Sequence, residues 1–387
     1  MSFTVLAVIC LVGLVGPLLA LPRQWHLPVV LGELMAGVVL GRTGLGFLDP
    51  GDETFGFLAD VGFALVMFVA GTHVPVRDRR LHPALGVGVT RAVAVGVAAV
   101  ALGYAVAALV GTPHAPLYAV LMASSSAAVI LPVKDSVGLG GEEVLRLLPQ
   151  VAIADAACIV LLPLAIDPGH AVRAALGALA VIGCGVAAYV AFAWVERSGW
   201  RERVHDVSEE RSFAVELRVS LTVLFALAAL AVALHVSIML AGFALGLAVS
   251  AVGEPRRVAR QLFAVTEGFF GPLFFVWLGA SLQVRELASH PGMIGLGLCL
   301  GAGATAAHLV ARLLGEPVPL AMLATAQLGV PVAAATIGEQ LGLLRPGEAS
   351  ALVLGALVTL AVAVSGGSLA VRAGLVEAPS PAGEEMA

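Results

Sequence analysis

The sequence has few charged residues and few aromatic residues. Charged residues make up 12% of its 387 residues and aromatic residues 6%, whereas 59% of the residues are hydrophobic. A soluble domain has about 25% charged and about 45–50% apolar residues. A water-soluble fold of this length could not hide so much apolar surface, so the composition excludes a soluble protein and indicates a polytopic membrane protein.

The four cysteines all lie in apolar runs, and none has the spacing of a metal site. We therefore expect small, buried apolar residues rather than disulfides or metal ligands. The first apolar run has no basic segment before it, which favours a membrane helix over a signal peptide. Only residues 374–387 follow the last run, and this short Pro-containing tail is expected to be disordered. We expect no cofactor, no nucleic-acid partner and no soluble nucleotide-binding domain.

Thirteen apolar segments are long enough to be membrane helices, since a crossing needs roughly 20 apolar residues. They lie at about residues 3–21, 28–47, 55–74, 84–110, 115–133, 144–166, 171–195, 212–233, 236–252, 261–283, 292–314, 318–340 and 347–373. The predicted fold class is therefore an all-α polytopic membrane protein with about 13 transmembrane helices.

The placement of Lys and Arg supports this count. If the N-terminus is outside, sixteen of the 21 Lys and Arg residues belong to inside connections and four to outside connections, while Arg91 lies within a helix. Cytoplasmic loops attract Lys and Arg. The pattern predicts a multi-pass protein of the plasma (inner) membrane with its N-terminus outside and its C-terminus in the cytoplasm.

Three short matches relate the two halves of the chain at a nearly constant offset. They are Leu65–Gly71 with Leu273–Gly279, Ala127–Ala128 with Ala333–Ala334, and Gly141–Glu142 with Gly347–Glu348. One helix separates the two halves, so the halves must run in opposite directions through the membrane. The sequence thus predicts two inverted six-helix repeats, a design found in many secondary transporters.

The repeat also predicts how the chain is divided. Residues 1–195 would hold the first repeat, at 1–166, and a linking helix at 171–195. The polar stretch 196–211 is expected to be a cytoplasmic linker, and residues 212–373 to form the second, inverted repeat.

The run Val144–Ile166 places one carboxylate, Asp155, at the centre of a predicted membrane helix. An ionised side chain at that depth costs several kcal/mol or more, so such residues usually have a function. A carboxyl group can hold either a proton or a monovalent cation, and Asp155 is therefore the predicted exchange site for both. The alternative is a structural Asp that pairs with a helix end.

Two segments are predicted to be interrupted near the membrane midplane. One contains Ser124, Ser125 and Ser126 and ends at Pro132, and the other contains Gly329 and Pro331. Pro removes a backbone donor, and Gly weakens a helix. Unwound carbonyls and half-helix ends would then help Asp155 to hold a cation, with the three serines as further binding residues. Otherwise the serines only pack or bond to the preceding turn.

Other polar residues at depth have less certain roles. Glu33 could serve ion access or structure, and His308 could be a second titrating group or a hydrogen-bonded packing residue. Arg91 lies close enough to the predicted cytoplasmic face to extend its charged end toward water.

Six segments carry a family resemblance. They are Leu27–Gly37, Leu65–Gly71, Ala123–Ser126, Ala154–Asp155, Ser237–Gly246 and Phe269–Gly279. Together they resemble the NapA/Kef branch of the monovalent cation/proton antiporters, in the sodium/hydrogen exchanger family. The resemblance implies an NhaA/NapA-like fold with a six-helix core domain and a dimerisation domain. It further implies a likeness in mechanism: elevator-type alternating access in a homodimer that moves Na⁺ or K⁺ against H⁺.

The sequence departs from this family in two ways. Electrogenic members have two adjacent acids in the sixth helix and others have Asn or Gln before the Asp, whereas this chain has Ala154. Many members also have a Lys in helix eleven, and residues 301–307 contain none. A single carboxylate predicts exchange of one proton for one monovalent cation, which is electroneutral.

Two other functions remain open at this point. A sodium-coupled organic-anion symporter of the bile-acid type has a similar fold, and a non-transporting sensor could retain the fold without its activity. A membrane-embedded aspartyl enzyme would need a second acid at depth, which the sequence does not offer, so we do not expect an enzyme.

Overall fold

The computed structural model describes residues 1–20, 29–72, 81–198, 215–234, 236–253, 262–282 and 284–376. This part of the chain is helical and contains no strand, only an isolated bridge between Leu139 and Val376. Most of the predicted linker 196–211 and most of the predicted tail 374–387 lie outside the described residues.

The helices run through the predicted apolar segments, because a helix satisfies its own backbone hydrogen bonds in lipid. In chain order they are α1 (Phe3–Gly13), α2 (Val15–Ala20), α3 (Val29–Leu40), α4 (Glu53–Thr72), α5 (Leu81–Val110), α6 (Ala115–Ala123), α7 (Ala127–Ser136), α8 (Glu142–Ile166), η1 (Pro168–His170), α9 (Ala171–Arg197), α11 (Val215–Ala233), α12 (Ile238–Val252), the π-helix η2 (Thr266–Phe270), α14 (Gly271–Ser281), α15 (Val284–Ser289), α16 (Pro291–Leu309), η3 (Val310–Leu314), α17 (Val318–Ala324), α18 (Gly329–Gln340) and α19 (Glu348–Arg372).

Within the described residues, nine helical segments are long and apolar enough to cross a membrane. Two shorter apolar stretches, at Phe3–Leu19 and Ile238–Val252, add to them. The predicted segment 115–133 is divided into α6 and α7, and the predicted segment 318–340 into α17 and α18. An all-helical, multi-pass membrane architecture follows from these helices, whereas the count of thirteen crossings stays a prediction.

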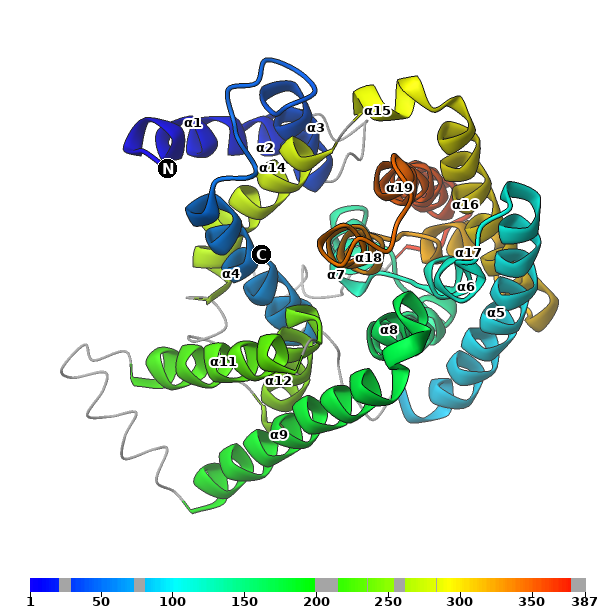
Figure 1. Ribbon diagram of the computed structural model, residues 1–387. Coiled ribbons are helices and arrows are strands. Elements are labelled where there is room, and N and C mark those ends of the chain that lie inside the picture. Colours follow the sequence, from blue (N-terminus) through cyan, green and yellow to red (C-terminus); the bar gives the residue numbers. More distant parts are fainter. Residues whose placement is uncertain are drawn as a thin grey trace, which may run out of the picture.

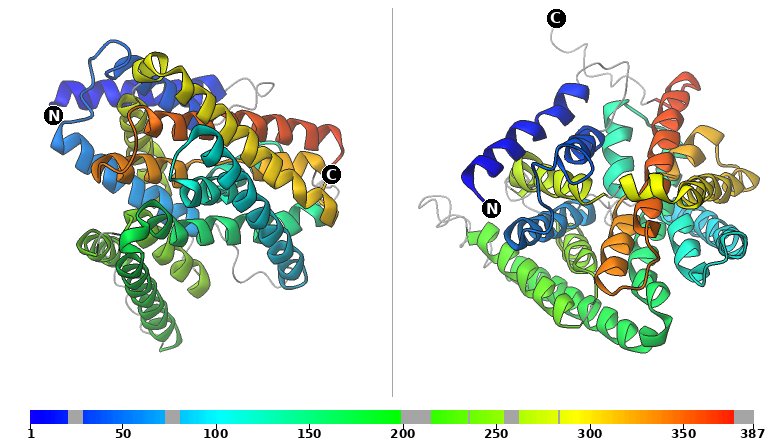
Figure 2. Two further views of the ribbon diagram at one scale, coloured as in Figure 1. Left: turned by 45° about the vertical axis from the view of Figure 1, so that its right-hand side comes forward. Right: turned by 45° about the horizontal axis from the view of Figure 1, so that its top comes forward.

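The helices gather into two bundles. The scaffold bundle comprises α1–α4, α11, α12, η2 and α14, and the core bundle comprises α5–α8, α16, η3 and α17–α19 (Figure 1). Helix α9 packs against both α12 and α8 and so connects the bundles. Figure 2 shows the arrangement from two further directions. Because each bundle takes helices from both sequence halves, the predicted repeats do not correspond to separate bodies in space.

Glycine allows α4 and α12 of the scaffold bundle to touch backbone to backbone. A Cβ atom on Gly242 would meet the backbone of Ala64, and one on Gly246 would overlap the carbonyl oxygen of Phe68. Small residues at such contacts are typical of helix packing in membranes, where close van der Waals contact replaces the hydrophobic effect. The α4–α12 contact therefore gives the scaffold bundle a tightly fitted centre.

A buried polar cluster ties α8 of the core bundle to α5 and to the connection between η3 and α17. Arg91 Nη2 donates to Glu143 Oε2 at 3.2 Å, and Gln150 Nε2 donates to Glu316 Oε2 at 3.2 Å. Arg91 is only 1% exposed. The expectation that Arg91 extends to water is therefore wrong, because the carboxylate of Glu143 gives its charge a partner below the surface.

A second buried cluster joins the beginnings of α6 and α19. Glu348 is fully buried and accepts hydrogen bonds from Tyr118 Oη at 2.5 Å and from the backbone N–H of Arg345 at 2.9 Å. His114 Nδ1 lies 2.7 Å from the same carboxylate. Glu142, which the sequence repeat matches with Glu348, instead lies at the surface and pairs with Arg146. The two positions both begin a helix after a glycine, yet only one is buried.

The cysteines differ from the expectation. Cys158 is buried, but Cys10 and Cys184 are exposed on the surfaces of α1 and α9, and Cys299 is intermediate. All four are free. In a membrane protein an apolar run does not imply burial in protein, because lipid also accepts a small apolar side chain.

The glycine contact of α4 and α12 generates a first prediction. Gly246→Val should lower the free energy of unfolding by about 1–3 kcal/mol or more, because the added carbons must displace the α4 backbone. Thermal unfolding of the purified protein in detergent measures this loss. Gly183→Val on α9 is the control, since a Cβ there would meet no atom within 4 Å. Equal unfolding temperatures for the two variants would contradict the prediction.

The polar cluster generates a second prediction. Glu316 lies between two membrane-spanning segments, and burial raises its pKa from 4.5 to about 7, opposed by the Gln150 hydrogen bond and by Arg91 and reinforced by Glu143. A raised carboxyl pKa stabilises the fold fully below the unfolded value, near 4.5, and this contribution is lost as the pH rises through about 7. The total change would be about 3 kcal/mol.

Glu316→Gln replaces the titrating carboxyl with a neutral group of the same shape. The native protein should lose stability between pH 5 and 8, and the variant should lose less. Unfolding temperatures across this range measure the difference, with Glu53→Gln at the exposed beginning of α4 as the control. If native protein and Glu316→Gln have the same pH profile, Glu316 does not titrate in this range.

Candidate functional site

Asp155 lies within α8, a continuous helix of the core bundle. The residue is buried, with 7% of its surface exposed. Helix α8 packs against α6 and α7, and against α17 and α18. Asp155 Oδ2 accepts a hydrogen bond of 3.0 Å from the backbone N–H of Ala127, the first residue of α7. The positive end of the α7 dipole therefore faces this carboxylate.

The chain is extended between α6 and α7. Ser124 has φ −71° and ψ 149°, which ends α6, and α7 begins at Ala127. Ser124 Oγ donates to the carbonyl of Leu121 at 2.9 Å, so this hydroxyl bonds to the preceding turn. Ser125 Oγ instead donates to the carbonyl of Ala324 at 2.5 Å, across to the other broken helix. All three serines, including Ser126, are buried.

The second break lies between α17 and α18, at residues 325–328. The backbone N–H of Ser126 donates to the carbonyl of Ala326 at 2.7 Å, which joins the two breaks directly. Thr325 Oγ1 lies within hydrogen-bond distance of the carbonyls of Met322 and Thr359, so it fixes the beginning of the break to α19. The two extended segments thus cross beside the Asp155 carboxylate and satisfy part of each other's backbone.

The predicted interrupting residues lie after the breaks and not within them. Pro132 is inside α7, Gly329 is the first residue of α18, and Pro331 is in the first turn of α18. A proline in the first turn of a helix removes an N–H that would have no intrahelical partner, so it fits there without breaking the helix. Pro331 and Gly329 therefore mark the start of the second half-helix.

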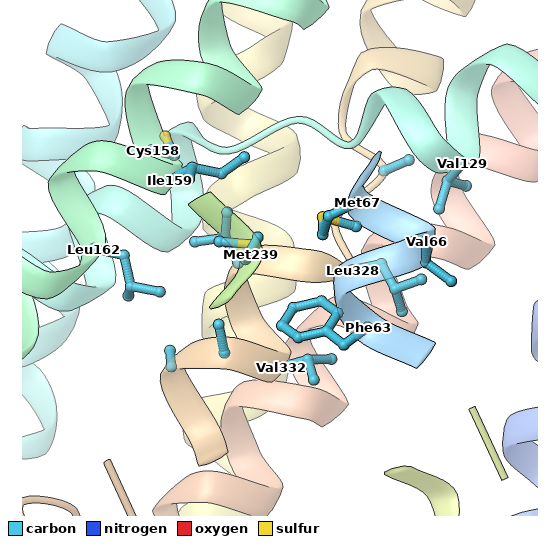
Figure 3. Close-up of a cluster of buried hydrophobic side chains, with 14 of the residues drawn as sticks. Phe63, Val66, Met67, Val129, Cys158, Ile159, Leu162, Met239, Leu328 and Val332 are labelled. Carbon is cyan, nitrogen blue, oxygen red and sulfur yellow. The ribbon is translucent and has the colours of Figure 1, made fainter. Parts of the chain in front are cut away.

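Apolar side chains of both bundles meet next to this crossing (Figure 3). Phe63 and Met67 come from α4, Met239 from α12, Leu328 and Val332 from the second broken helix, and Cys158, Ile159 and Leu162 from α8. On the core side, the break at Leu328–Gly329 faces the sulfur atoms of two methionines. A Cβ on Gly329 would lie 3.3 Å from Met239 Sδ and 3.5 Å from Met67 Sδ. The scaffold bundle therefore meets the site with a flexible, apolar surface.

The remaining predicted site residues are distributed between the bundles. Ala154 is buried beside Asp155 in α8 and brings no polar group. His308 is buried in α16, where Nδ1 lies 2.9 Å from the carbonyl of Ala304 one turn earlier. Glu33 is buried in α3 of the scaffold bundle, close enough to Glu267 of η2 for the two carboxyl groups to interact electrostatically. The structure thus brings together Asp155 and the serines but gives His308 a bond within its own helix.

A cavity of about 200 Å³ lies between the bundles, on the side where α18 ends. Trp277 and Ser281 of α14 line it from the scaffold bundle, and Thr336 and Ser350 line it from the core bundle. Glu339 is also part of this lining. An opening lined by both polar and apolar side chains is therefore present between the bundles, on one side of the crossing.

Reading the sequence missed two features near the site. Gln327 is buried within the second break, although the segment that contains it was singled out for Gly329 and Pro331. The Gln150–Glu316 contact was missed because Glu316 belongs to a connection between helices and looked like a surface residue. A polar residue inside an otherwise apolar run was the available signal for Gln327.

Among the described residues, no group of three or more His, Cys, Asp or Glu side chains could hold a metal ion together. The site instead offers one carboxylate, helix-end amides, serine hydroxyls and backbone carbonyls. The carboxylate, hydroxyl and carbonyl oxygens are possible ligands of a cation of low charge, whereas the amide N–H groups stabilise the carboxylate.

Comparison with known proteins agrees with this architecture. A solved structure, that of the sodium proton antiporter MjNhaP1 from Methanocaldococcus jannaschii at pH 8, matches with a TM-score of 0.66 at 14% sequence identity. The match covers 95% of this chain and 97% of that chain, so it shows a common fold.

Two relatives have similar sequences over most of this chain. YjbQ of Bacillus subtilis (strain 168), named as a Na⁺/H⁺ antiporter, is 23% identical over an alignment of 387 positions, and this alignment covers 92% of this chain. The match spans 61% of the length of YjbQ. A protein of Methanocaldococcus jannaschii, named as Na⁺/H⁺ antiporter 3, is 23% identical over 341 residues, which cover 83% of this chain and 85% of that protein.

The family model described as "Sodium/hydrogen exchanger, transmembrane" matches residues 5–372, which is nearly the whole chain. This match confirms the family resemblance and places the chain among membrane transporters and not among enzymes. The crossing of two broken helices beside a buried carboxylate lies within the matched residues, and the chain belongs to the sodium/hydrogen exchanger family.

Proposed function

We propose that the protein exchanges Na⁺ or K⁺ for H⁺ across the membrane and that Asp155 holds both ions in turn. The observation that supports this most directly is the hydrogen bond from the Ala127 N–H to the buried Asp155 carboxylate, where the two broken helices cross. The names of YjbQ and of Na⁺/H⁺ antiporter 3 favour Na⁺ as the cation. K⁺ stays open because the oxygen groups around Asp155 suit either ion.

The exchange step needs only one carboxyl group. On one side of the membrane the Asp155 O–H bond breaks, the proton leaves to water, and the carboxylate binds the monovalent cation. On the other side the cation leaves and a proton forms a new O–H bond with the same carboxylate. Serine hydroxyls and unwound carbonyls of Ser124, Ser125 and Ser126 would replace part of the water around the cation.

The arrangement of the two bundles supports alternating access by an elevator-type movement. The core bundle contains both broken helices and Asp155, and it meets the scaffold bundle through apolar side chains such as Phe63, Met67 and Met239 (Figure 3). An apolar contact has few directional bonds to break when one bundle moves along the other. We propose that the scaffold bundle also forms the homodimer, in the plasma membrane with the N-terminus outside.

The two alternative functions are weaker. The family match favours ion exchange over a sodium-coupled organic-anion symporter. A non-transporting sensor would share the fold and the site, so only a transport measurement distinguishes it from an exchanger.

The first test of this proposal is Asp155→Asn, which keeps the shape of the side chain but removes its ability to lose a proton. Native protein in liposomes with a pH gradient should change the internal pH when Na⁺, K⁺ or Li⁺ is added. The variant should show no response above that of empty liposomes. An internal pH-sensitive dye measures the change.

Asp167→Asn is the matched control, because Asp167 is at the C-terminal end of the same helix and bonds to His170 near the surface. It should transport like the native protein. Equal responses from native protein and Asp155→Asn would remove Asp155 from the mechanism. No response of native protein to any cation would favour the symporter or sensor.

The second test concerns the charge moved in each cycle. Because one proton replaces one monovalent cation on a single carboxylate, we expect no net current when a cation gradient is applied to protein on a solid-supported membrane. The same preparation must show pH changes in liposomes for this result to count. A current that follows the cation gradient would contradict electroneutral exchange.

A further inference from the structure

Gln327 is a buried polar residue within the crossing of the broken helices. It lies in the break between α17 and α18 and is only 4% exposed. Its Nε2 atom is buried and has no hydrogen-bond partner among the described residues. A buried donor left without a partner destabilises the fold, so a polar side chain in this position needs an explanation.

The amide of Gln327 can present either of its two ends. Its oxygen and nitrogen have nearly the same shape, and their assignment follows from the surrounding hydrogen bonds. The buried end has no acceptor within the described part of the chain, so it gains nothing from presenting nitrogen. If it presents oxygen instead, it offers a carbonyl ligand of the kind that monovalent cations bind.

Short connections place Gln327 next to the Asp155 site. The carbonyl of Ala326, the residue before Gln327, accepts from the Ser126 N–H at 2.7 Å. The N–H of Ala127, the residue after Ser126, donates to Asp155 Oδ2 at 3.0 Å. Gln327 therefore follows directly after the residue that bonds to Ser126, and Asp155 in α8 bonds to the residue that follows Ser126.

The residues on either side of Gln327 in the break make packing contacts or hydrogen bonds. Leu328 and Gly329, which follow it, face the scaffold bundle through Met67 and Met239 (Figure 3). Thr325, two residues before it, bonds to carbonyls of α17 and α19. The other residues of the break are thus occupied with packing or backbone bonds, whereas the Gln327 amide is not.

The residue directly before Asp155 in α8 is Ala154, which is buried and has no polar side-chain atom. A cation bound at Asp155 would therefore find no side-chain ligand at this position of α8. An amide approaching from the second broken helix would supply one.

We propose that the side-chain oxygen of Gln327 is a ligand of the monovalent cation held by Asp155 and helps to set which cation is bound. This proposal rests on the proposed function, because it presupposes that the cation binds at Asp155. It assigns to the second broken helix a side-chain contribution to the site, in addition to its backbone carbonyls.

The test compares Gln327→Met with Gln327→Glu. Methionine has nearly the same length and shape as glutamine but no oxygen, whereas glutamate keeps an oxygen at the same place. Gln340→Met is the matched control, because Gln340 is exposed at the other end of α18. Each variant is reconstituted in liposomes, and initial rates are measured against Na⁺, Li⁺ and K⁺ concentration.

For Gln327→Met we expect the apparent KM for Na⁺ to rise by about tenfold or more, the effect of losing one ligand to a charged group, with little change in the maximal rate. The ratio of KM values for Na⁺, Li⁺ and K⁺ should also change. Gln327→Glu keeps an oxygen at this place and adds a negative charge, so its KM for Na⁺ should not rise above the native value, and Gln340→Met should be unchanged. A role in packing alone would predict a lower maximal rate at unchanged KM and unchanged cation ratios, which would overturn the proposal.

A binding measurement without transport completes the test. Na⁺ should raise the unfolding temperature of the native protein in detergent, since a ligand stabilises the state that binds it. This rise should be smaller in Gln327→Met even if its unfolding temperature without Na⁺ is native-like. An equal rise in both proteins would overturn the proposal, whatever the transport rates are.

Asp155→Asn in the same two assays separates this proposal from the proposed function. If Asp155→Asn loses the Na⁺ response and Gln327→Met behaves like Gln340→Met, only the assignment of Gln327 fails. If Asp155→Asn keeps the native Na⁺ response, the exchange site itself is misplaced and both proposals fail.

Discussion

The structure depends on one constraint, that a polypeptide cannot leave backbone N–H and C=O groups unbonded in lipid. Breaking two helices within apolar segments exposes such groups, and the chain meets the constraint by making the two breaks bond to each other and to α8. The Ser126 N–H finds the Ala326 carbonyl, and the Ala127 N–H finds Asp155. The carboxylate therefore satisfies a backbone donor of the fold and is also the proposed ion ligand. Removing its charge would weaken a helix end and a binding site together.

The two bundles are held together by different kinds of contact. The core bundle holds most of the buried polar contacts, including Arg91 with Glu143 and Gln150 with Glu316, and these contacts fix its helices to one another. The α4–α12 contact in the scaffold bundle is held by close backbone contact at glycines such as Gly242 and Gly246. One body is thus fixed by polar bonds and the other by shape at its centre, and they meet through apolar side chains. In the proposed elevator-type movement, a boundary of this kind would shift without breaking the bonds that hold either body together.

The sequence was sufficient for the features that follow from composition and periodicity. Apolar runs located the helices, and Asp155 was conspicuous because it is a charge in the middle of such a run. The positions of the breaks could not be read in the same way. Gly329 and Pro331 look like interrupting residues, yet a helix accepts both in its first turn, so the break precedes them. Arg91 was misjudged for a related reason, since its partner Glu143 is 52 residues away and only the packing of α5 on α8 brings them together. Burial within protein and exposure to lipid also look alike in sequence, which is why Cys10 and Cys184 were misplaced.

Electrostatics explains why one carboxylate at a half-helix end suits a monovalent exchange. The N-terminus of a helix acts roughly as half a positive charge and its C-terminus as half a negative charge. The two breaks bring two ends of each sign to the crossing, so these partial charges roughly cancel. The empty site therefore carries about the one negative charge of the Asp155 carboxylate. Either a proton or a monovalent cation neutralises this charge, and the two loaded states are therefore nearly equivalent. A divalent cation would leave about one positive charge in a low-dielectric surrounding, which is far less favourable. A neutral ligand such as the Gln327 amide can then distinguish one monovalent ion from another through distance and geometry without disturbing this balance.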